Sequence, residues 1–233
     1  MHRTRAGFRN CVQMCKGQSL AHRIPNLRMD NMTKPKIALI IGSTRPTRFA
    51  DIPAQWMLAQ AQARSDMTVE LVDLRDYDLP FFAEMASNAW MPSADPKAVA
   101  WQQKMAGFDG YIFIVAEYNR SLTAALKNAL DQAYVEWNHK PMTALAYGSV
   151  GGTRAMEHLR TVAVELQMVP TRNAVHLGMV DFFKVHPGMG GSGKMADVEA
   201  NLLPAAKAAL DDLVWWAKAT MAARTVPVAI AAA

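Results

Sequence analysis

The chain has 233 residues and 51% of them are hydrophobic, which is enough for one sizeable core. No apolar run approaches the roughly 18 residues of a membrane-spanning helix, so we expect no membrane partner. The formal net charge of +5 is unevenly distributed: residues 1–36 hold eight Lys or Arg and one Asp, whereas acidic residues slightly outnumber basic ones in the rest. The basic character therefore belongs to the N-terminal segment.

This segment predicts an extension outside the fold. We expect residues 1–33 to form a basic, disordered extension, residues 34–222 a single domain, and residues 223–233 a frayed C-terminal tail. A solvated extension is favoured over contact with nucleic acid or an anionic membrane. A transit peptide and a translation start at Met29 or Met32 stay open as alternatives.

The two cysteines, Cys11 and Cys15, both lie in this extension. The domain therefore has no cysteine nucleophile and no cysteine-ligated metal, which is typical of a reducing compartment. We expect the protein to be cytoplasmic. The six histidines show no metal-binding spacing, so no metal site is expected.

Apolar runs alternate with amphipathic stretches from residue 36 onward. The expected strands are residues 36–41, 68–74, 110–115, 141–147 and 171–177. The expected helices are residues 51–64, 96–107, 121–137, 152–168 and 198–221. Strands that alternate with helices predict an α/β fold with a parallel sheet and helices on both faces. Five strands fit a three-layer, flavodoxin-like fold with the strand order 2-1-3-4-5.

The first expected strand ends at a polar loop, residues 42–48, with the sequence Gly-Ser-Thr-Arg-Pro-Thr-Arg. Ser43 and Thr47 offer hydroxyl groups, and Arg45 and Arg48 bring two positive charges. The helix that follows has free N–H groups and a dipole that favour an anion at its N-terminus. The loop therefore predicts a phosphate site, and the simpler alternative is a solvated turn.

Two further strands end at loops suited to a flat ring. Residues 117–119, Glu-Tyr-Asn, combine an aromatic ring with an amide, and the simpler interpretation of Asn119 is a helix N-cap. Residues 148–152, Gly-Ser-Val-Gly-Gly, include three glycines, which have no Cβ to keep a ligand away, although such a loop also makes a tight turn. Ligands of open parallel sheets bind at the carboxyl ends of the strands, so the three loops predict one site.

These motifs resemble the NAD(P)H-dependent FMN reductases of the flavodoxin-like fold. The resemblance rests on residues 42–48, 117–119, 125–131 and 147–152, and it covers about residues 36–180 with all motifs in order. Each motif alone is weak, whereas the set is specific. One departure is Ala116, where the family usually has proline, and this affects the expected conformation of the second loop.

The resemblance implies bound FMN, with NADPH or NADH as co-substrate. Hydride would pass through the flavin to a small acceptor such as a quinone, a free flavin, an azo dye or a metal oxyanion. No side chain is expected to act as a catalytic acid or base. The resemblance places the FMN phosphate at Ser43, Arg45, Thr47 and Arg48. It places the isoalloxazine ring at Glu117, Tyr118, Asn119, Ser149, Gly151 and Gly152.

Two other functions stay open at this point. One is a flavodoxin-like one-electron carrier, which the two arginines of the first loop disfavour. The other is a regulatory protein that keeps the fold without the flavin, for which Ala116 is the one hint. A yellow protein that NADPH bleaches without a partner protein would distinguish the reductase from both.

The resemblance also implies a homodimer or homotetramer. Apolar residues beyond those needed for one core lie at the C-terminal end of the expected helix 121–137 and in the long loop after the second expected strand. They predict an exposed interface patch, formed by Leu79, Phe81, Phe82, Tyr134, Val135 and Trp137.

Overall fold

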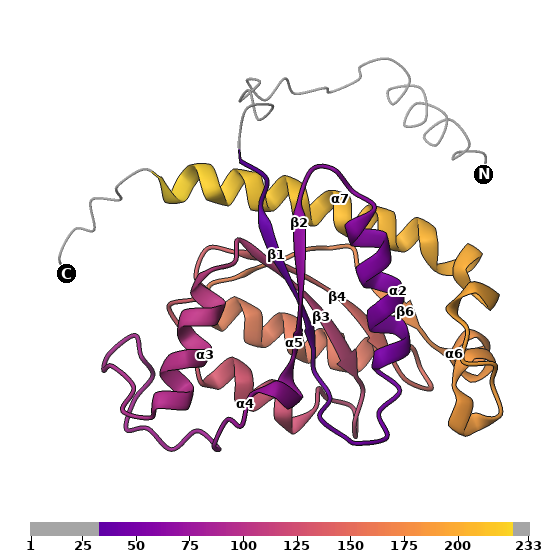
Figure 1. Ribbon diagram of the computed structural model, residues 1–233, viewed down its shortest axis with the longest axis horizontal. Helices are drawn as coiled ribbons and strands as arrows, with labels where there is room; N and C mark the ends of the chain where they lie inside the picture. The colour runs from indigo at the N-terminus through magenta and orange to yellow at the C-terminus, as the bar shows by residue number, and fades with distance from the viewer. Residues whose placement is uncertain (1–32, 226–233) are drawn as a thin grey trace, which may run out of the picture. The chain divides into compact units, whose positions relative to one another are not determined.

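The computed structural model describes residues 33–225, and nearly all of the predicted N-terminal extension and most of the predicted C-terminal tail lie outside them. The described residues form a parallel sheet with helices on both faces (Figure 1). Its strands are β1 (Lys36–Ile41), β2 (Thr68–Asp73), β3 (Gly110–Ala116), β4 (Pro141–Tyr147), β5 (Val169–Pro170) and β6 (Val175–Leu177). The strand order β2-β1-β3-β4-β5 confirms the predicted flavodoxin-like topology.

The register of the sheet brings the carboxyl ends of three strands together. Ile41 of β1 lies opposite Ile114 of β3, and Ala116 of β3 lies opposite Tyr147 of β4. The loops that follow β1, β3 and β4 therefore leave the same edge. In Figure 1 the loop after β1, drawn in indigo, turns at the bottom of the view close to the ends of β3 and β4.

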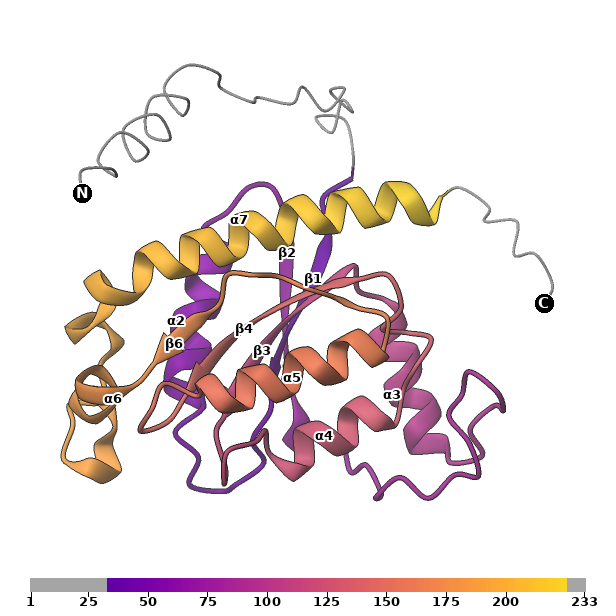
Figure 2. The same cartoon turned by 180° about the vertical axis from the view of Figure 1, so that it is seen from behind.

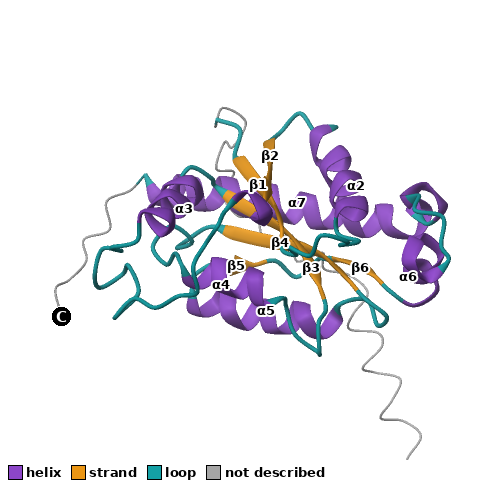
Figure 3. Cartoon of the chain, turned by 60° about the horizontal axis from the view of Figure 1, so that its bottom comes forward, coloured by secondary structure: helices purple, strands orange, loops and turns teal. Residues whose placement is uncertain are grey.

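Two apolar clusters hold the three layers together. One face of the sheet packs against α2 (Asp51–Gln62) and α7 (Glu199–Arg224), and the other against α3 (Pro96–Ala106), α4 (Ala124–Asp131) and α5 (Thr153–Glu165). Figure 3 shows α4 and α5 on the opposite side of the strands from α2. Figure 2, from behind, shows α7 running across the direction of the strands.

The structure differs from the predicted elements in four places. The predicted fifth strand, residues 171–177, is a strand only over Val175–Leu177 (β6), and the two-residue strand β5 lies just before the predicted range. Both strands pair with β4, and the N–H of Thr171 still donates to the Met142 carbonyl. A short helix, α6 (Met179–Val185), follows where none was predicted, and Phe182 buries it against the core. The helix α7 runs through Pro204 without interruption and continues to Arg224.

The predicted helix 121–137 is much shorter than expected, since α4 ends at Asp131. The chain then turns, and Trp137 becomes fully buried against Trp101, Tyr111 and Phe113. Its indole N–H donates to the carbonyls of residues 130 and 133. The placement of Trp137 in an exposed patch was therefore wrong, because its neighbours lie within the same subunit.

Within residues 33–225, no helix is long and apolar enough to span a membrane.

Candidate functional site

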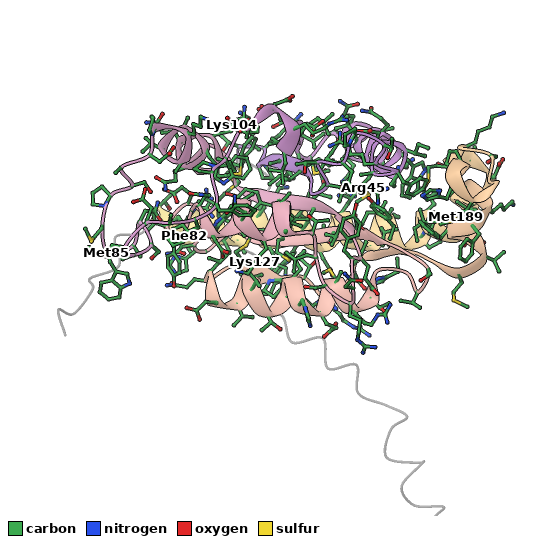
Figure 4. The ribbon with its side chains drawn as sticks, turned by 90° about the horizontal axis from the view of Figure 1, so that it is seen from below. Arg45, Phe82, Met85, Lys104, Lys127 and Met189 are labelled. Carbon is green, nitrogen blue, oxygen red and sulfur yellow. The ribbon has the colours of Figure 1, made fainter. Side chains whose placement is uncertain are left out.

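The site begins with free donors on the loop after β1. Ser43 is buried, whereas residues 44–47 are exposed. Among the described residues, the backbone N–H groups of Thr44, Arg45 and Thr47 donate to no acceptor, and the hydroxyls of Thr44 and Thr47 make no hydrogen bond. Figure 4 looks at this edge from below and shows Arg45 on it. The loop thus presents unused N–H and O–H groups beside one exposed cation, as an anion site requires.

Arg48 is not free in this way. Its side chain is 1% exposed, and its five N–H donors are occupied. Nη1 donates to the Ser43 carbonyl at 2.7 Å and to Asp73 at 2.6 Å, Nη2 donates to Asp73 at 2.5 Å and to Asp51, and Nε donates to Asp51 at 2.9 Å. Burial lowers the pKa of Arg48, but the bonds to Asp73 and Asp51 outweigh it and raise the pKa above its ordinary value.

The Asp73 carboxylate, which holds Arg48, makes the free energy of unfolding depend on pH in the acid range. Burial would raise the pKa of Asp73, but the hydrogen bonds from Arg48 and Arg75 outweigh it and lower the pKa from 3.8 to about 2. A carboxylate with a lowered pKa stabilises the fold above its unfolded pKa and loses that contribution as the pH falls through the folded value. We therefore expect the free energy of unfolding to drop by on the order of 1–2 kcal/mol as the pH falls from about 4 to about 2.

Urea unfolding of the wild type and of Asp73→Asn across this pH range measures that contribution. The wild type should lose its advantage over the variant as the pH falls. A difference between the two proteins that does not change with pH would contradict the assignment.

Tyr118 joins the second loop to the first. Its hydroxyl lies 3.2 Å from Ser43 Oγ and accepts a hydrogen bond from Arg45 Nη1 at 3.3 Å. The Arg45 guanidinium also lies 5.7 Å from the centroid of the Tyr118 ring, within the range of a cation–π contact. Residues 75 positions apart in the sequence thus meet at one point of the edge.

The second loop continues into a strained turn. The backbone N–H and carbonyl of Tyr118 pair with those of Ser121, at 2.9 and 3.0 Å. The two residues between them, Asn119 and Arg120, have φ of 49° and 70°. Positive φ is uncommon outside glycine, and Asn tolerates it better than most residues. Asn119 is therefore not a helix N-cap; that position belongs to Thr123, whose hydroxyl accepts from Leu126 N and donates to the Gly42 carbonyl.

Glu117 connects the second loop to α5. Its side chain is 4% exposed, and its carboxylate accepts from the backbone N–H groups of Arg154 and Ala155 in the first turn of the helix. It also forms an ion pair with the Arg154 side chain. A carboxylate at a helix N-terminus satisfies free N–H groups and the dipole. The backbone N–H of Glu117 donates to the Tyr147 carbonyl, so the carboxyl ends of β3 and β4 stay paired.

The third loop depends on its glycines. Gly151 and Gly152 have φ of 80° and 64°, and a Cβ on Gly152 would lie 2.6 Å from the Tyr147 nitrogen. Gly178, just before α6, packs against Gly151 so closely that a Cβ on it would overlap the Gly151 backbone. The backbone carbonyl of Ser149 accepts from the Met179 N–H at 3.1 Å, and His176 Nδ1 lies 2.9 Å from the Gly151 carbonyl oxygen. Loop and α6 therefore support each other.

A pocket of about 390 Å³ lies beside the first loop. It opens between that loop, the segment after β2 and the start of α4, and its lining includes Thr44, Leu79, Phe81, Ala125 and Asn128. Asn128 holds the segment in place, since its amide accepts from Phe82 N and donates to the Pro80 carbonyl.

The comparisons with known proteins agree with this geometry. The sequence model of the NADPH-dependent FMN reductase family matches residues 35–181. The chain belongs to the NADPH-dependent FMN reductase family. An NAD(P)H-dependent FMN reductase of Schizosaccharomyces pombe is 34% identical over 151 residues, which are 61% of this chain and 74% of that protein. A quinone reductase of Escherichia coli K12 is 28% identical over 67% of this chain and 84% of its own.

Solved structures share the fold. The flavoenzyme NAD(P)H:acceptor oxidoreductase FerB of Paracoccus denitrificans superposes with a TM-score of 0.58 at 18% identity, over 80% of this chain and 98% of that one. Membership of the NADPH-dependent FMN reductase family confirms the predicted FMN cofactor, the NAD(P)H co-substrate and the oxidoreductase class. The residues fit that cofactor, because the first loop offers unused donors for an anion.

Sequence reasoning missed several residues that shape this candidate site. Asp73 and Asp51 hold Arg48, Thr123 holds Gly42, and Gly178 supports the third loop. All of them lie outside the three recognised loops. The one available signal was Asp73, because the predicted strand order places the end of β2 next to the first loop, where its carboxylate can reach an arginine.

Proposed function

We propose that the three loops hold FMN and that the protein passes hydride from NAD(P)H to a small acceptor. Ser43, Arg45 and Thr47 would bind the phosphate through their hydroxyl, guanidinium and N–H groups, with Arg48 and Asp73 beneath them. The ring would lie between Tyr118–Asn119 and Ser149–Gly152. The observation that carries this proposal is the set of unused donors on residues 44–47 beside the Tyr118 contact.

When bound, FMN would supply the hydride chemistry between the nicotinamide of NAD(P)H and the acceptor. The chain supplies position and charge. Arg45 offsets the phosphate charge while it stays on Tyr118, and the Asn119 amide, on a turn fixed by Ser121, offers donor and acceptor groups to the polar edge of the ring. Gly151 and Gly152 give the third loop its tight turn at positive φ, in which the Gly151 N–H donates to the Gly148 carbonyl. Glu117 keeps the second and third loops at a fixed spacing through α5.

Quinones are the acceptor class that we favour. Relatives of this chain include a 2-hydroxy-1,4-benzoquinone reductase of Burkholderia and an NADPH:quinone oxidoreductase of Arabidopsis thaliana, at 32% and 30% identity. The pocket beside Thr44 and Phe81 offers apolar walls of a size that suits a small ring. Free flavin, azo dyes and metal oxyanions are alternative acceptors for the same site.

We further propose a homo-oligomer in the cytoplasm. The segment between β2 and α3 exposes Phe81, Met85 and Trp90 by 82%, 89% and 85%, which is more apolar surface than single scattered residues produce. Figure 4 shows Phe82 and Met85 from this segment at one end of the face that carries Arg45. The cysteine-free sequence from residue 16 onward suits a reducing compartment.

Removing the Arg45 side chain tests the phosphate site. We expect Arg45→Ala to weaken FMN binding by about tenfold, the effect of losing one charged hydrogen bond, while riboflavin, which lacks the phosphate, binds as before. Flavin fluorescence titration measures both constants, and absorbance near 450 nm reports bound flavin. Arg160→Ala, which removes a partly exposed arginine on α5, is the matched control. An equal loss for FMN and riboflavin, or none for either, would place the phosphate elsewhere.

A further inference from the structure

The buried guanidinium of Arg48 lies directly under the exposed donors of the first loop. It bridges three separate parts of the chain: the Ser43 carbonyl after β1, Asp73 at the end of β2, and Asp51 in the first turn of α2. Its own backbone N–H donates to the Arg45 carbonyl at 3.2 Å. The loop is thus closed on itself by two contacts that both involve Arg48.

We infer that Arg48 is a positioning residue that presets the loop for phosphate, and not a ligand of the phosphate. This inference rests on the proposed FMN site. Its first support is geometric. In a trans peptide the C=O and the following N–H point in opposite directions. Because Arg48 Nη1 holds the Ser43 carbonyl, the N–H of Thr44 is turned away from Arg48, toward the side where it finds no acceptor among residues 33–225.

The second support is charge. Arg48 and its neighbour Arg75 together face Asp51 and Asp73, so two positive charges are matched by two negative ones. Asp73 also accepts from the backbone N–H of Arg75 at 2.9 Å, which fixes the carboxylate. Arg48 therefore adds no uncompensated positive charge to the loop, and Arg45 is the arginine that can respond to an anion. Removing either carboxylate would leave part of the buried guanidinium charge without a partner, which is strongly destabilising.

The two roles predict opposite effects of removing Asp73. If Arg48 were a phosphate ligand, Asp73→Asn would free its donors and charge and would leave FMN binding unchanged or tighter. If Arg48 positions the loop, Asp73→Asn loosens its hold, and FMN binding should weaken by roughly tenfold while riboflavin binding changes little. Arg48→Lys should weaken FMN binding as well, although it keeps the positive charge, because an ammonium cannot bond two carboxylates and a carbonyl in one plane.

Hydrogen–deuterium exchange gives a readout that needs no flavin. In FMN-free protein, amides in residues 43–48 should exchange faster in Asp73→Asn and Arg48→Lys than in the wild type. Arg64→Met is the matched control, since Arg64 also bonds two carboxylates, Asp66 and Asp211, but lies outside the three loops of the site. That variant should change neither loop exchange nor flavin binding.

The outcomes separate the inference from the proposed function. Unchanged loop exchange in Asp73→Asn, or FMN binding that tightens in it, overturns the positioning role. Faster loop exchange with no FMN binding by the wild type overturns the proposed phosphate site and leaves the structural role of Arg48 standing. If Arg48→Lys does not fold, Asp51→Asn tests the same bridge from its other end.

Discussion

Replacing Gly178 with alanine should release the flavin while most of the fold remains. A Cβ at this position would overlap the nitrogen and Cα of Gly151, so either the third loop or the start of α6 must move. The loop is the weaker partner, because its neighbours Gly151 and Gly152 both sit at positive φ. Forcing an extra methyl into packed backbone costs about 1–3 kcal/mol, which corresponds to roughly 5- to 150-fold in affinity.

Flavin titration and thermal melting, followed together, check this result. The variant should lose affinity for FMN and riboflavin alike, since the ring and not the phosphate is affected, and this separates it from Arg45→Ala. Gly107→Ala is the control, because a Cβ there would meet its nearest atom at an ordinary 3.5 Å. Normal flavin affinity in Gly178→Ala would show that the ring does not lie against this loop.

Replacing Trp137 with aspartate should unfold the protein and not merely dissociate it. The indole is fully buried, packs edge-on to Tyr111 at 4.7 Å between ring centroids, and donates to two backbone carbonyls. Truncating such a side chain costs about 3–5 kcal/mol, and a buried carboxylate without a partner adds to that cost. This approaches the whole stability of an ordinary domain.

Phe82→Asp is the informative companion. Phe82 is 38% exposed and belongs to the proposed oligomer surface. This variant should keep the urea midpoint of the wild type and shift the mass measured by light scattering toward the monomer. Trp137→Asp should instead lower the urea midpoint strongly or fail to accumulate as folded protein. If the two variants dissociate alike and both stay folded, the buried position of Trp137 is contradicted.

The centre of the sheet could be predicted from sequence because β1, β3 and β4 are apolar on both faces and each ends at a loop of distinct chemistry. Lys36–Ile41 and Gly110–Ala116 were placed almost to the residue. The elements that were missed depend on contacts distant in sequence. Helix α4 stops at Asp131 because the following turn buries Trp137, and α6 forms where Phe182 packs against Phe49 and Tyr147. No local pattern carries that information.

The candidate site, like the fold, was predictable from sequence only in part. The sequence predicted which loops would converge, since strand order determines this. It predicted that Arg45 lies deeper in the turn than Arg48, and this was wrong, because Arg45 is exposed and Arg48 is buried among partners that the motif does not contain. The carboxylates that bury Arg48 come from β2 and α2, 25 and 3 residues away in the chain. Burial of a charge depends on such partners and not on its position in the motif.

The position of α7 affects the order in which the protein can be completed during synthesis. The family match ends at residue 181, yet Leu202, Leu210 and Leu213 of α7 cover one face of the sheet. While the ribosome still holds these residues, the three loops have already emerged above a sheet with one apolar face covered only in part, by α2. Domains fold as units, so we expect the nascent chain to need its last helix before its core is complete. The segment that matches the family model therefore lacks the helix that completes one layer of the fold.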